Sequence, residues 1–292
     1  MLKTNENDFF ESVIFHAIGE PPTIKRIQFL SGGYGNNVVK LETSVGNFCV
    51  KWHETLPEKA FIAQKADLSY LNRLGVIQVP EPISAGKINQ KSFLLMEDIG
   101  LHLPKNNFWE LLGEQLALLH ANNQKTFGWQ QTNWLHGFAL KNSSETDWAT
   151  FYFENRLKPL FGKAFFEGKI EEAMLRKIDM LQEKTKQLFP KEPPSLVHGN
   201  LYRDNIIAGE GGLPFLQSPV PYFGNRELEL VRVLFLNDIP EVFFDAYQTT
   251  FPLSENFEDR KPLYQLYILG QYLNQFGASY LGGVEKIFNK FL

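Results

Sequence analysis

Polar side chains with catalytic or metal-binding chemistry gather around one predicted hairpin. Two short apolar runs, 205–208 and 213–217, flank the turn Gly209-Glu210-Gly211-Gly212, a pattern typical of a β-hairpin. His198, Asn200, Asp204 and Asn205 stand in front of it, and Gln217 and Ser218 follow it, before a proline. We interpret the stretch as a catalytic loop followed by a metal-binding loop.

A second group of residues suits phosphate binding. Residues 31–37 form a turn containing Gly32 and Gly33, and glycines let backbone N–H groups approach an anion closely. Lys51 follows about 15 to 20 residues later on a predicted strand, the spacing at which kinases place the lysine that binds nucleotide phosphates. A plain tight turn and an ordinary edge-strand lysine are the alternatives, and the two signals together favour phosphate binding.

These residues resemble a motif of the fructosamine (ketosamine) kinases, within the aminoglycoside-phosphotransferase and protein-kinase-like superfamily. That motif reads His-Gly-Asp-Leu-Trp-x-x-Asn, a hairpin, and Asp-Pro-Ala-x-Tyr-Tyr-Gly-Asp-Arg-Glu-x-Asp-Leu. The corresponding stretches here are His198-Gly199-Asn200-Leu201-Tyr202-Arg203-Asp204-Asn205 and Ser218-Pro219-Val220-Pro221-Tyr222-Phe223-Gly224-Asn225-Arg226-Glu227-Leu228-Glu229-Leu230. Residues 147–157 and 260–280 are similar to the family as well, so the resemblance covers nearly the whole chain.

The resemblance implies a role for each residue of the catalytic stretch. Asn200 stands at the position of the catalytic base. For His198 we favour a structural role, in which it braces the backbone of its loop, over a catalytic one. Asn205 matches a metal-binding asparagine, whereas Ser218 replaces the aspartate that holds magnesium. Asp204, at a variable position, is a candidate substitute base, with a surface-pointing side chain as the alternative.

The resemblance also implies a nucleotide site in the first third of the chain. Lys51 would bind the phosphates, and Gln64 stands where the family has the glutamate that holds this lysine. Gln64 can accept a hydrogen bond from Lys51 but offers no countercharge. Backbone groups near Glu97 and Ile99 would hydrogen-bond an adenine edge, with an ordinary strand-to-loop transition as the alternative.

Acids of the family motif are missing from the candidate site. Gln64, Asn200 and Ser218 are neutral, and Asn225 and Glu229 also stand where the motif has aspartates, with Pro221 at a small apolar position. We therefore predict a pseudokinase that binds a nucleotide, a phosphosugar or a partner with little phosphoryl transfer; ATP is its expected ligand, and the loss of the aspartate argues against Mg²⁺. An active ATP-dependent ketosamine kinase and a scaffold that binds no nucleotide are the alternatives, so enzymatic activity stays open.

The predicted elements fit a two-lobed, protein-kinase-like α+β fold. Apolar periodicity predicts a capping helix over 7–18, three antiparallel strands within 24–52, a helix over 57–74 and a buried strand over 92–97. These form an N-lobe, 1–98, with one main helix. The remainder, 99–292, is a mostly helical C-lobe on the catalytic-loop and substrate side, with predicted helices over 108–120, 147–160, 169–189 and 228–236. We expect His120 to cap the end of its helix.

Composition limits the classes of partner. The chain has 292 residues, 43% of them hydrophobic, and 33 acids against 29 bases give a net charge of −4 without a block of one sign, which argues against nucleic-acid binding. Cys49 is the single cysteine, as suits a reducing compartment. The N-terminal sequence is not a signal peptide and no apolar run is long enough to span a membrane, so we expect a cytoplasmic protein. The expected partner is a small ketosamine or sugar-amine, or a protein; the oligomeric state is open.

Overall fold

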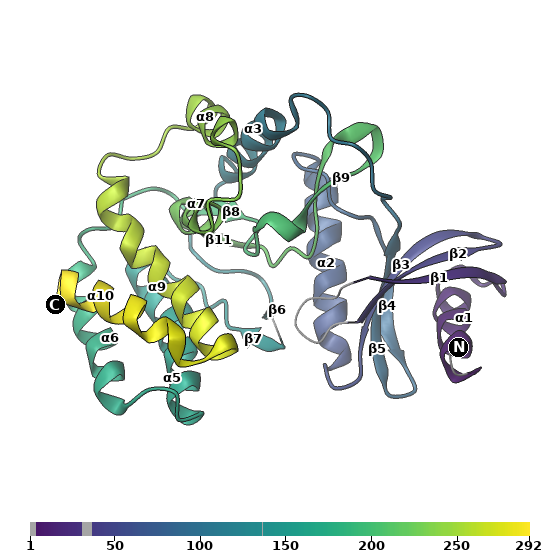
Figure 1. The fold of residues 1–292 in the computed structure, drawn as a ribbon, viewed down its shortest axis with the longest axis horizontal. Helices are drawn as coiled ribbons and strands as arrows, with labels where there is room; N and C mark the ends of the chain where they lie inside the picture. Colours follow the sequence, from purple (N-terminus) through teal and green to yellow (C-terminus); the bar gives the residue numbers. More distant parts are fainter. Residues whose placement is uncertain (1–3, 31–36, 136) are drawn as a thin grey trace. The chain divides into compact units, whose positions relative to one another are not determined.

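The computed structural model describes residues 4–30, 37–135 and 137–292, and its elements are drawn in Figure 1. The chain divides into two compact units. The first comprises 1–108, 133–139 and 204–220, and the second comprises 109–132, 140–203 and 221–292. The chain therefore crosses between the units within the loop that follows His198, so the candidate site residues are divided between the two units.

The first unit is built on a five-stranded antiparallel sheet in the order β1-β2-β3-β5-β4. Its strands are β1 (Ile24–Leu30), β2 (Asn37–Thr43), β3 (Gly46–His53), β4 (Pro82–Ile88) and β5 (Lys91–Glu97). Alternate residues of a strand point to opposite faces. On one face, Phe48, Val50 and Trp52 of β3 pack against the apolar side of α1 (Thr4–Ile18). The fold confirms the predicted strands and the capping helix.

Helix α2 (Glu58–Leu74) packs against β4 and β5 on the face of the sheet opposite α1 (Figure 1). It ends at Gly75, whose φ of 67° is a left-handed conformation that glycine adopts without steric cost, and the Gly75 N–H donates to the Leu71 carbonyl at 3.1 Å. The buried side of α2 carries Ala60, Phe61, Ala63, Asp67, Leu68 and Leu71. These mostly apolar residues form the side of α2 that faces the sheet.

The predicted hairpin is present and belongs to the first unit. Strands β9 (Ile206–Ala208) and β10 (Pro214–Leu216) pair antiparallel around the glycine-rich turn. Hydrogen bonds attach the hairpin to the segments beside it: His102 N–H donates to the Ala208 carbonyl at 3.0 Å, and Leu216 N–H donates to the Gln78 carbonyl at 2.8 Å. The two ends of the hairpin are thereby held in register.

The second unit is mainly helical. Its helices are α3 (Phe108–His120), α4 (Trp148–Tyr152), α5 (Lys158–Phe166), α6 (Glu172–Thr185), α7 (Arg226–Phe235), α8 (Glu241–Thr250), α9 (Phe257–Phe276) and α10 (Leu281–Phe291). The single helix predicted over 147–160 was wrong in detail. A π-helical segment, Phe153–Leu157, joins α4 to α5, so the helical run continues to Phe166.

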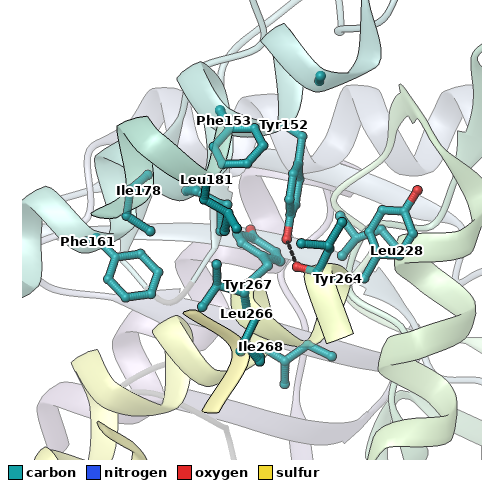
Figure 2. Close-up of a cluster of buried hydrophobic side chains, with 14 of the residues drawn as sticks. Tyr152, Phe153, Phe161, Ile178, Leu181, Leu228, Tyr264, Leu266, Tyr267 and Ile268 are labelled. Carbon is teal, nitrogen blue, oxygen red and sulfur yellow. Dashed lines mark hydrogen bonds between the residues drawn. The ribbon is translucent and has the colours of Figure 1, made fainter. Parts of the chain in front are cut away.

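An aromatic core holds these helices together (Figure 2). Tyr152, Phe153 and Phe161 belong to one buried cluster with Tyr264 and Tyr267 of α9, in which the Tyr152 and Tyr264 rings are in edge-to-face contact. The Tyr152 hydroxyl donates to the Leu263 carbonyl at 2.7 Å, which satisfies its one polar atom inside the core. The aromatic residues of this cluster therefore have a structural role.

None of the helices that the structure describes combines the length and the apolar character needed to cross a membrane.

Candidate functional site

The phosphate-binding candidate Lys51 lies buried in the middle of the sheet. It belongs to β3, which has β2 on one side and β5 on the other, so the edge-strand alternative is wrong. Its Nζ donates to Gln64 Oε1 of α2 at 3.3 Å, the contact that the sequence predicts. Burial lowers the pKa of Lys51 to about 8, because Gln64 brings no negative charge to offset the desolvation of the ammonium group.

The other predicted nucleotide contacts are partly described. Gly32 and Gly33 lie outside the described residues. Glu97 ends β5, and its N–H donates to the Glu81 carbonyl at 3.0 Å while its Oε1 accepts the Glu81 N–H at 2.9 Å. The Glu97 N–H is thus used inside the sheet. Ile99 lies two residues after Glu97, outside the strand, and is half-buried.

The two metal-ligand candidates stand at the two ends of the hairpin in the first unit. Asn205 is buried at the start of β9, and Ser218 is exposed after β10. A hydrogen bond of 2.8 Å from the Gln217 N–H to the Asn205 carbonyl holds these ends together. The fold therefore brings the two predicted metal positions to the same end of the hairpin.

Ser218 has an unusual backbone conformation, with a φ of 51°. This left-handed region is unfavourable for most residues but several-fold enriched in asparagine and aspartate. A serine here occupies a backbone shape that suits the aspartate of the family motif. The backbone of the predicted metal loop thus suits the aspartate of the motif, whereas the residue present, Ser218, has no carboxylate.

Asp204, the candidate substitute base, is exposed in a 3-10 turn formed by Arg203–Asn205. It lies in the first unit together with Asn205 and Ser218. Among the residues described, no three His, Cys, Asp or Glu side chains come together as a metal site would require. The oxygen donors at the metal positions are therefore an amide and a hydroxyl.

The catalytic-loop candidates His198 and Asn200 are buried in the second unit. They directly follow β8 (Ser195–Val197), which pairs antiparallel with β11 (Tyr222–Gly224). The Asn200 N–H donates to His198 Nδ1 in a long hydrogen bond of 3.4 Å. This contact joins the histidine ring to the backbone of its own loop, which is what the predicted bracing role implies. The loop is thus supported from its own histidine.

A buried carboxylate supports the same loop from helix α7. Glu229 accepts the His198 N–H at 2.8 Å with one oxygen and the Gly199 N–H at 2.7 Å with the other. Burial acts to raise the pKa of Glu229, but the hydrogen bonds that its carboxylate accepts from the His120 ring and the His198 N–H outweigh it, so the pKa lies below its usual value. The glutamate therefore keeps the negative charge of the aspartate that stands at this position in the family motif, so this replacement removes no charge.

Asn225, which stands where the motif has an aspartate, also has a structural role. It is the N-cap of α7, and its Oδ1 accepts the Glu227 N–H at 2.9 Å. Asparagine and aspartate serve about equally well at this position. The change from aspartate to Asn225 therefore leaves the start of α7 intact.

The prediction that His120 caps the end of helix α3 was wrong. It is fully buried, with Nε2 3.0 Å from Glu229 Oε2 and Nδ1 2.8 Å from the Tyr247 hydroxyl. A carboxylate can only accept, so Nε2 carries the proton and Nδ1 accepts from Tyr247. Burial lowers the pKa of His120 and keeps the ring neutral, which suits this pattern.

The hydrogen bonds around His120 continue from Tyr247 to Arg226 and Glu192. Arg226 donates to the Tyr247 hydroxyl at 3.3 Å and forms a two-pronged ion pair with Glu192, with both distances 2.8 Å. This chain of contacts, which we call the loop-support network, comprises Glu229, His120, Tyr247, Arg226 and Glu192. The sequence gives no signal for this network, because its members are spread from residue 120 to residue 247 and no local spacing links them.

The chain is similar to known proteins over nearly its whole length. The model of the fructosamine kinase family matches residues 8–292. A probable ketoamine kinase of Enterococcus faecium is 32% identical over 262 residues, which cover 89% of this chain and 93% of that protein. A probable ketoamine kinase of Synechocystis is 27% identical over 96% of this chain and 94% of its own.

Solved structures agree. A protein from Haemophilus somnus assigned as a fructosamine-3-kinase superposes with a TM-score of 0.86 at 26% identity, covering 97% of this chain and 96% of that one. An aminoglycoside phosphotransferase variant solved with ADP and hygromycin B has a TM-score of 0.62 at 14% identity over 96% and 97% of the two chains. The second likeness concerns the fold alone, and it is the fold of kinase-like phosphotransferases.

Proposed function

Since the chain belongs to the fructosamine kinase family, we propose that it is a degenerate kinase which binds a phosphate-bearing ligand at Lys51 and transfers phosphate poorly. One observation carries the proposal: the buried Lys51 ammonium faces the neutral amide of Gln64, while neutral residues also stand at the base and metal positions, Asn200 and Ser218. The cation that binds phosphate is kept and the acids that promote transfer are not.

The base position lacks a proton acceptor. Phosphoryl transfer needs the acceptor hydroxyl to be held and partly deprotonated, and a positioned base contributes roughly 10²–10⁴ in rate. The Asn200 amide can orient a hydroxyl through hydrogen bonds but cannot take its proton. Asn200 therefore supports binding better than turnover.

The metal position does not fit magnesium. Mg²⁺ is a hard cation that proteins hold through carboxylates, whereas the groups here are the Ser218 hydroxyl and the Asn205 amide. We therefore assign no step to a metal ion. Ligand binding would then depend on the charge of Lys51. An anionic ligand beside this buried ammonium group would offset the free-energy cost of its desolvation.

The loop-support network has the same role whether the protein only binds a ligand or also transfers phosphate. Glu229 holds the His198 and Gly199 N–H groups and so fixes the direction of the loop that carries Asn200. Retention of this support keeps the loop ready to position a ligand. An aspartate introduced at position 200 would therefore lie on a loop whose backbone Glu229 already holds in place.

An active ketosamine kinase is the second candidate. Relatives named ketoamine kinases match nearly the full chain, and Lys51 and Asn205 are both kept. In this case ATP is the phosphate donor, a small ketosamine is the acceptor, and the exposed Asp204 serves as the base. The wild-type turnover rate separates the two candidates.

A thermal-shift series with ATP, with and without Mg²⁺, tests the binding proposal. We expect a modest stabilisation by ATP that Mg²⁺ leaves unchanged and that Lys51→Ala abolishes, because a ligand stabilises the folded state by RT ln(1 + [L]/Kd). A large stabilisation seen only with ATP and Mg²⁺ together would show that the metal has its own ligands and would contradict the proposal. An unchanged shift in Lys51→Ala would remove Lys51 from the site.

A further inference from the structure

A second lysine shares the face of the sheet on which Lys51 contacts α2. Lys40 of β2 lies opposite Cys49 of β3, and Cys49 lies opposite Met96 of β5. Because Cys49 and Lys51 are two residues apart on one strand, their side chains point to the same face, away from the core that contains Phe48 and Val50. Lys40 therefore lies on the same face as Lys51, beside Cys49.

Lys40 forms an ion pair that crosses this face. Its Nζ lies 2.5 Å from Asp98 Oδ2, with 26% and 13% of the two side chains exposed. Asp98 directly follows β5, and β3 lies between β2 and β5, so the pair reaches across β3. Burial raises the pKa of Cys49 to about 11, and the charge of Asp98 adds to the effect, which agrees with a carboxylate close to the thiol.

The carboxylate is held in this position from both sides. Asp98 Oδ1 accepts the Gly100 N–H at 3.2 Å while Oδ2 contacts Lys40. Moving Asp98 aside would break both contacts and leave two partly desolvated charges apart. The ion pair is therefore a built feature of this face.

The pair occupies the place that a nucleobase would need. A nucleotide with its phosphates at Lys51 and its base edge at the backbone of 97–99 would lay its ring over β3 between them, at Cys49. We propose that this face binds a phosphate-bearing anion without a nucleobase, a polyphosphate or a sugar phosphate, and that the Lys40–Asp98 pair excludes the base. This inference rests on the proposed function, since it takes Lys51 as the anion-binding residue.

Calorimetric titrations without Mg²⁺ test it, with inorganic tripolyphosphate, glucose 6-phosphate and ATP as probes. For the wild type we expect tripolyphosphate or glucose 6-phosphate to bind at least as tightly as ATP, and the tighter of the two identifies the class of anion. Asp98→Asn keeps an acceptor for the Gly100 N–H but removes the charge that holds Lys40. It should raise ATP affinity roughly tenfold, which is easily resolved by titration, and leave the other two probes nearly unchanged.

Glu42→Gln is the matched control, because it removes one negative charge from the same face of β2 without touching Asp98. It should leave the ratio of ATP to tripolyphosphate affinity as in the wild type. The inference is overturned if wild-type ATP binds about tenfold more tightly than both other anions, or if Asp98→Asn leaves the ratio unchanged. Binding of none of the three probes would overturn it as well.

Cys49 supplies a second readout, because it is the single cysteine of the chain. In Asp98→Asn, ATP should slow alkylation of Cys49 and tripolyphosphate should not; in the wild type, neither should protect it. Equal protection by ATP in both proteins would overturn the inference. Selective ATP binding without phosphate transfer would defeat this inference alone, whereas rapid transfer would defeat the proposed function.

Discussion

The Nζ of Lys51 and the Oε1 of Gln64 are 3.3 Å apart, and this contact joins the central strand of the sheet to helix α2. In the family that the chain belongs to, the resemblance places a glutamate at Gln64, which would make the contact an ion pair. Here a buried ammonium group has a neutral partner. The contact that the resemblance implies is therefore present, but it is a hydrogen bond to a neutral amide and not an ion pair.

The first prediction concerns the pH dependence of stability. Burial lowers the pKa of Lys51 to about 8 in the folded state, below roughly 10.4 for an unfolded lysine. Between these values the unfolded chain binds more protons, so the stability of the wild type relative to Lys51→Met should rise with pH, by roughly 3 kcal/mol at most. Urea unfolding at several pH values between 7 and 10 measures this difference.

Gln64→Glu is the informative companion variant. A carboxylate beside Lys51 favours its charged form, so the pKa should move back up and the rise of stability between pH 8 and 10 should shrink. Parallel stability curves for the wild type and Lys51→Met would mean that Lys51 titrates normally and is better solvated than its position indicates.

The second prediction concerns the backbone of Ser218. Its φ of 51° is costly for most side chains, worst for β-branched ones, and is tolerated by asparagine. Ser218→Thr should therefore lower the free energy of unfolding by about 1–2 kcal/mol, whereas Ser218→Asn should not lower it. Chemical denaturation compares the two variants. Equal losses in both would show that the serine hydroxyl matters more than the backbone conformation.

The third prediction concerns Glu229. Its carboxylate accepts two backbone N–H groups and the His120 Nε2–H, and an amide presents a donor to one of them, so Glu229→Gln should lower the free energy of unfolding by about 1–3 kcal/mol. The folded-state pKa of Glu229 is lowered, so its stabilisation is complete above the unfolded pKa of about 4.3 and is lost as pH falls through the folded value.

The gap in stability between the wild type and Glu229→Gln should therefore narrow as the solution is acidified. Denaturation at pH 7 and in steps below pH 4 measures it. Glu183→Gln, which changes an exposed glutamate of α6, is the control and should show neither the loss nor the pH dependence. A gap that stays constant with pH would contradict the role of the Glu229 charge.

Much of the fold could be predicted because its signals are local. Alternating apolar residues mark the strands, and Gly75 marks the end of α2, so periods and turn residues decide these elements without reference to the rest of the chain. The hairpin after Asn205 was equally clear from its glycines. The break of the helix after Tyr152 was not, because a π-helical segment follows from packing in the aromatic core.

The candidate site was predicted where the chemistry follows from a motif, and missed where it depends on distant contacts. Lys51 was identified from its spacing after the glycine-containing turn and Gln64 from the family resemblance, and the two side chains do meet. His120 was assigned to its own helix end, yet its partners are Glu229 and Tyr247, more than a hundred residues away. Only tertiary packing brings such groups together, so the pattern of one sequence carries no signal for them.

The central claim is that the kinase frame has lost the acids that drive transfer, and phosphate transfer from ATP to a fructosamine in the presence of Mg²⁺ tests it most directly. The wild type should stay near background, and Asn200→Asp combined with Ser218→Asp should gain Mg²⁺-dependent transfer, because the loop that carries residue 200 is already held by Glu229. Wild-type turnover at roughly 1 to 100 per second, ordinary for kinases, would contradict the account and make Asp204 the first candidate for the base.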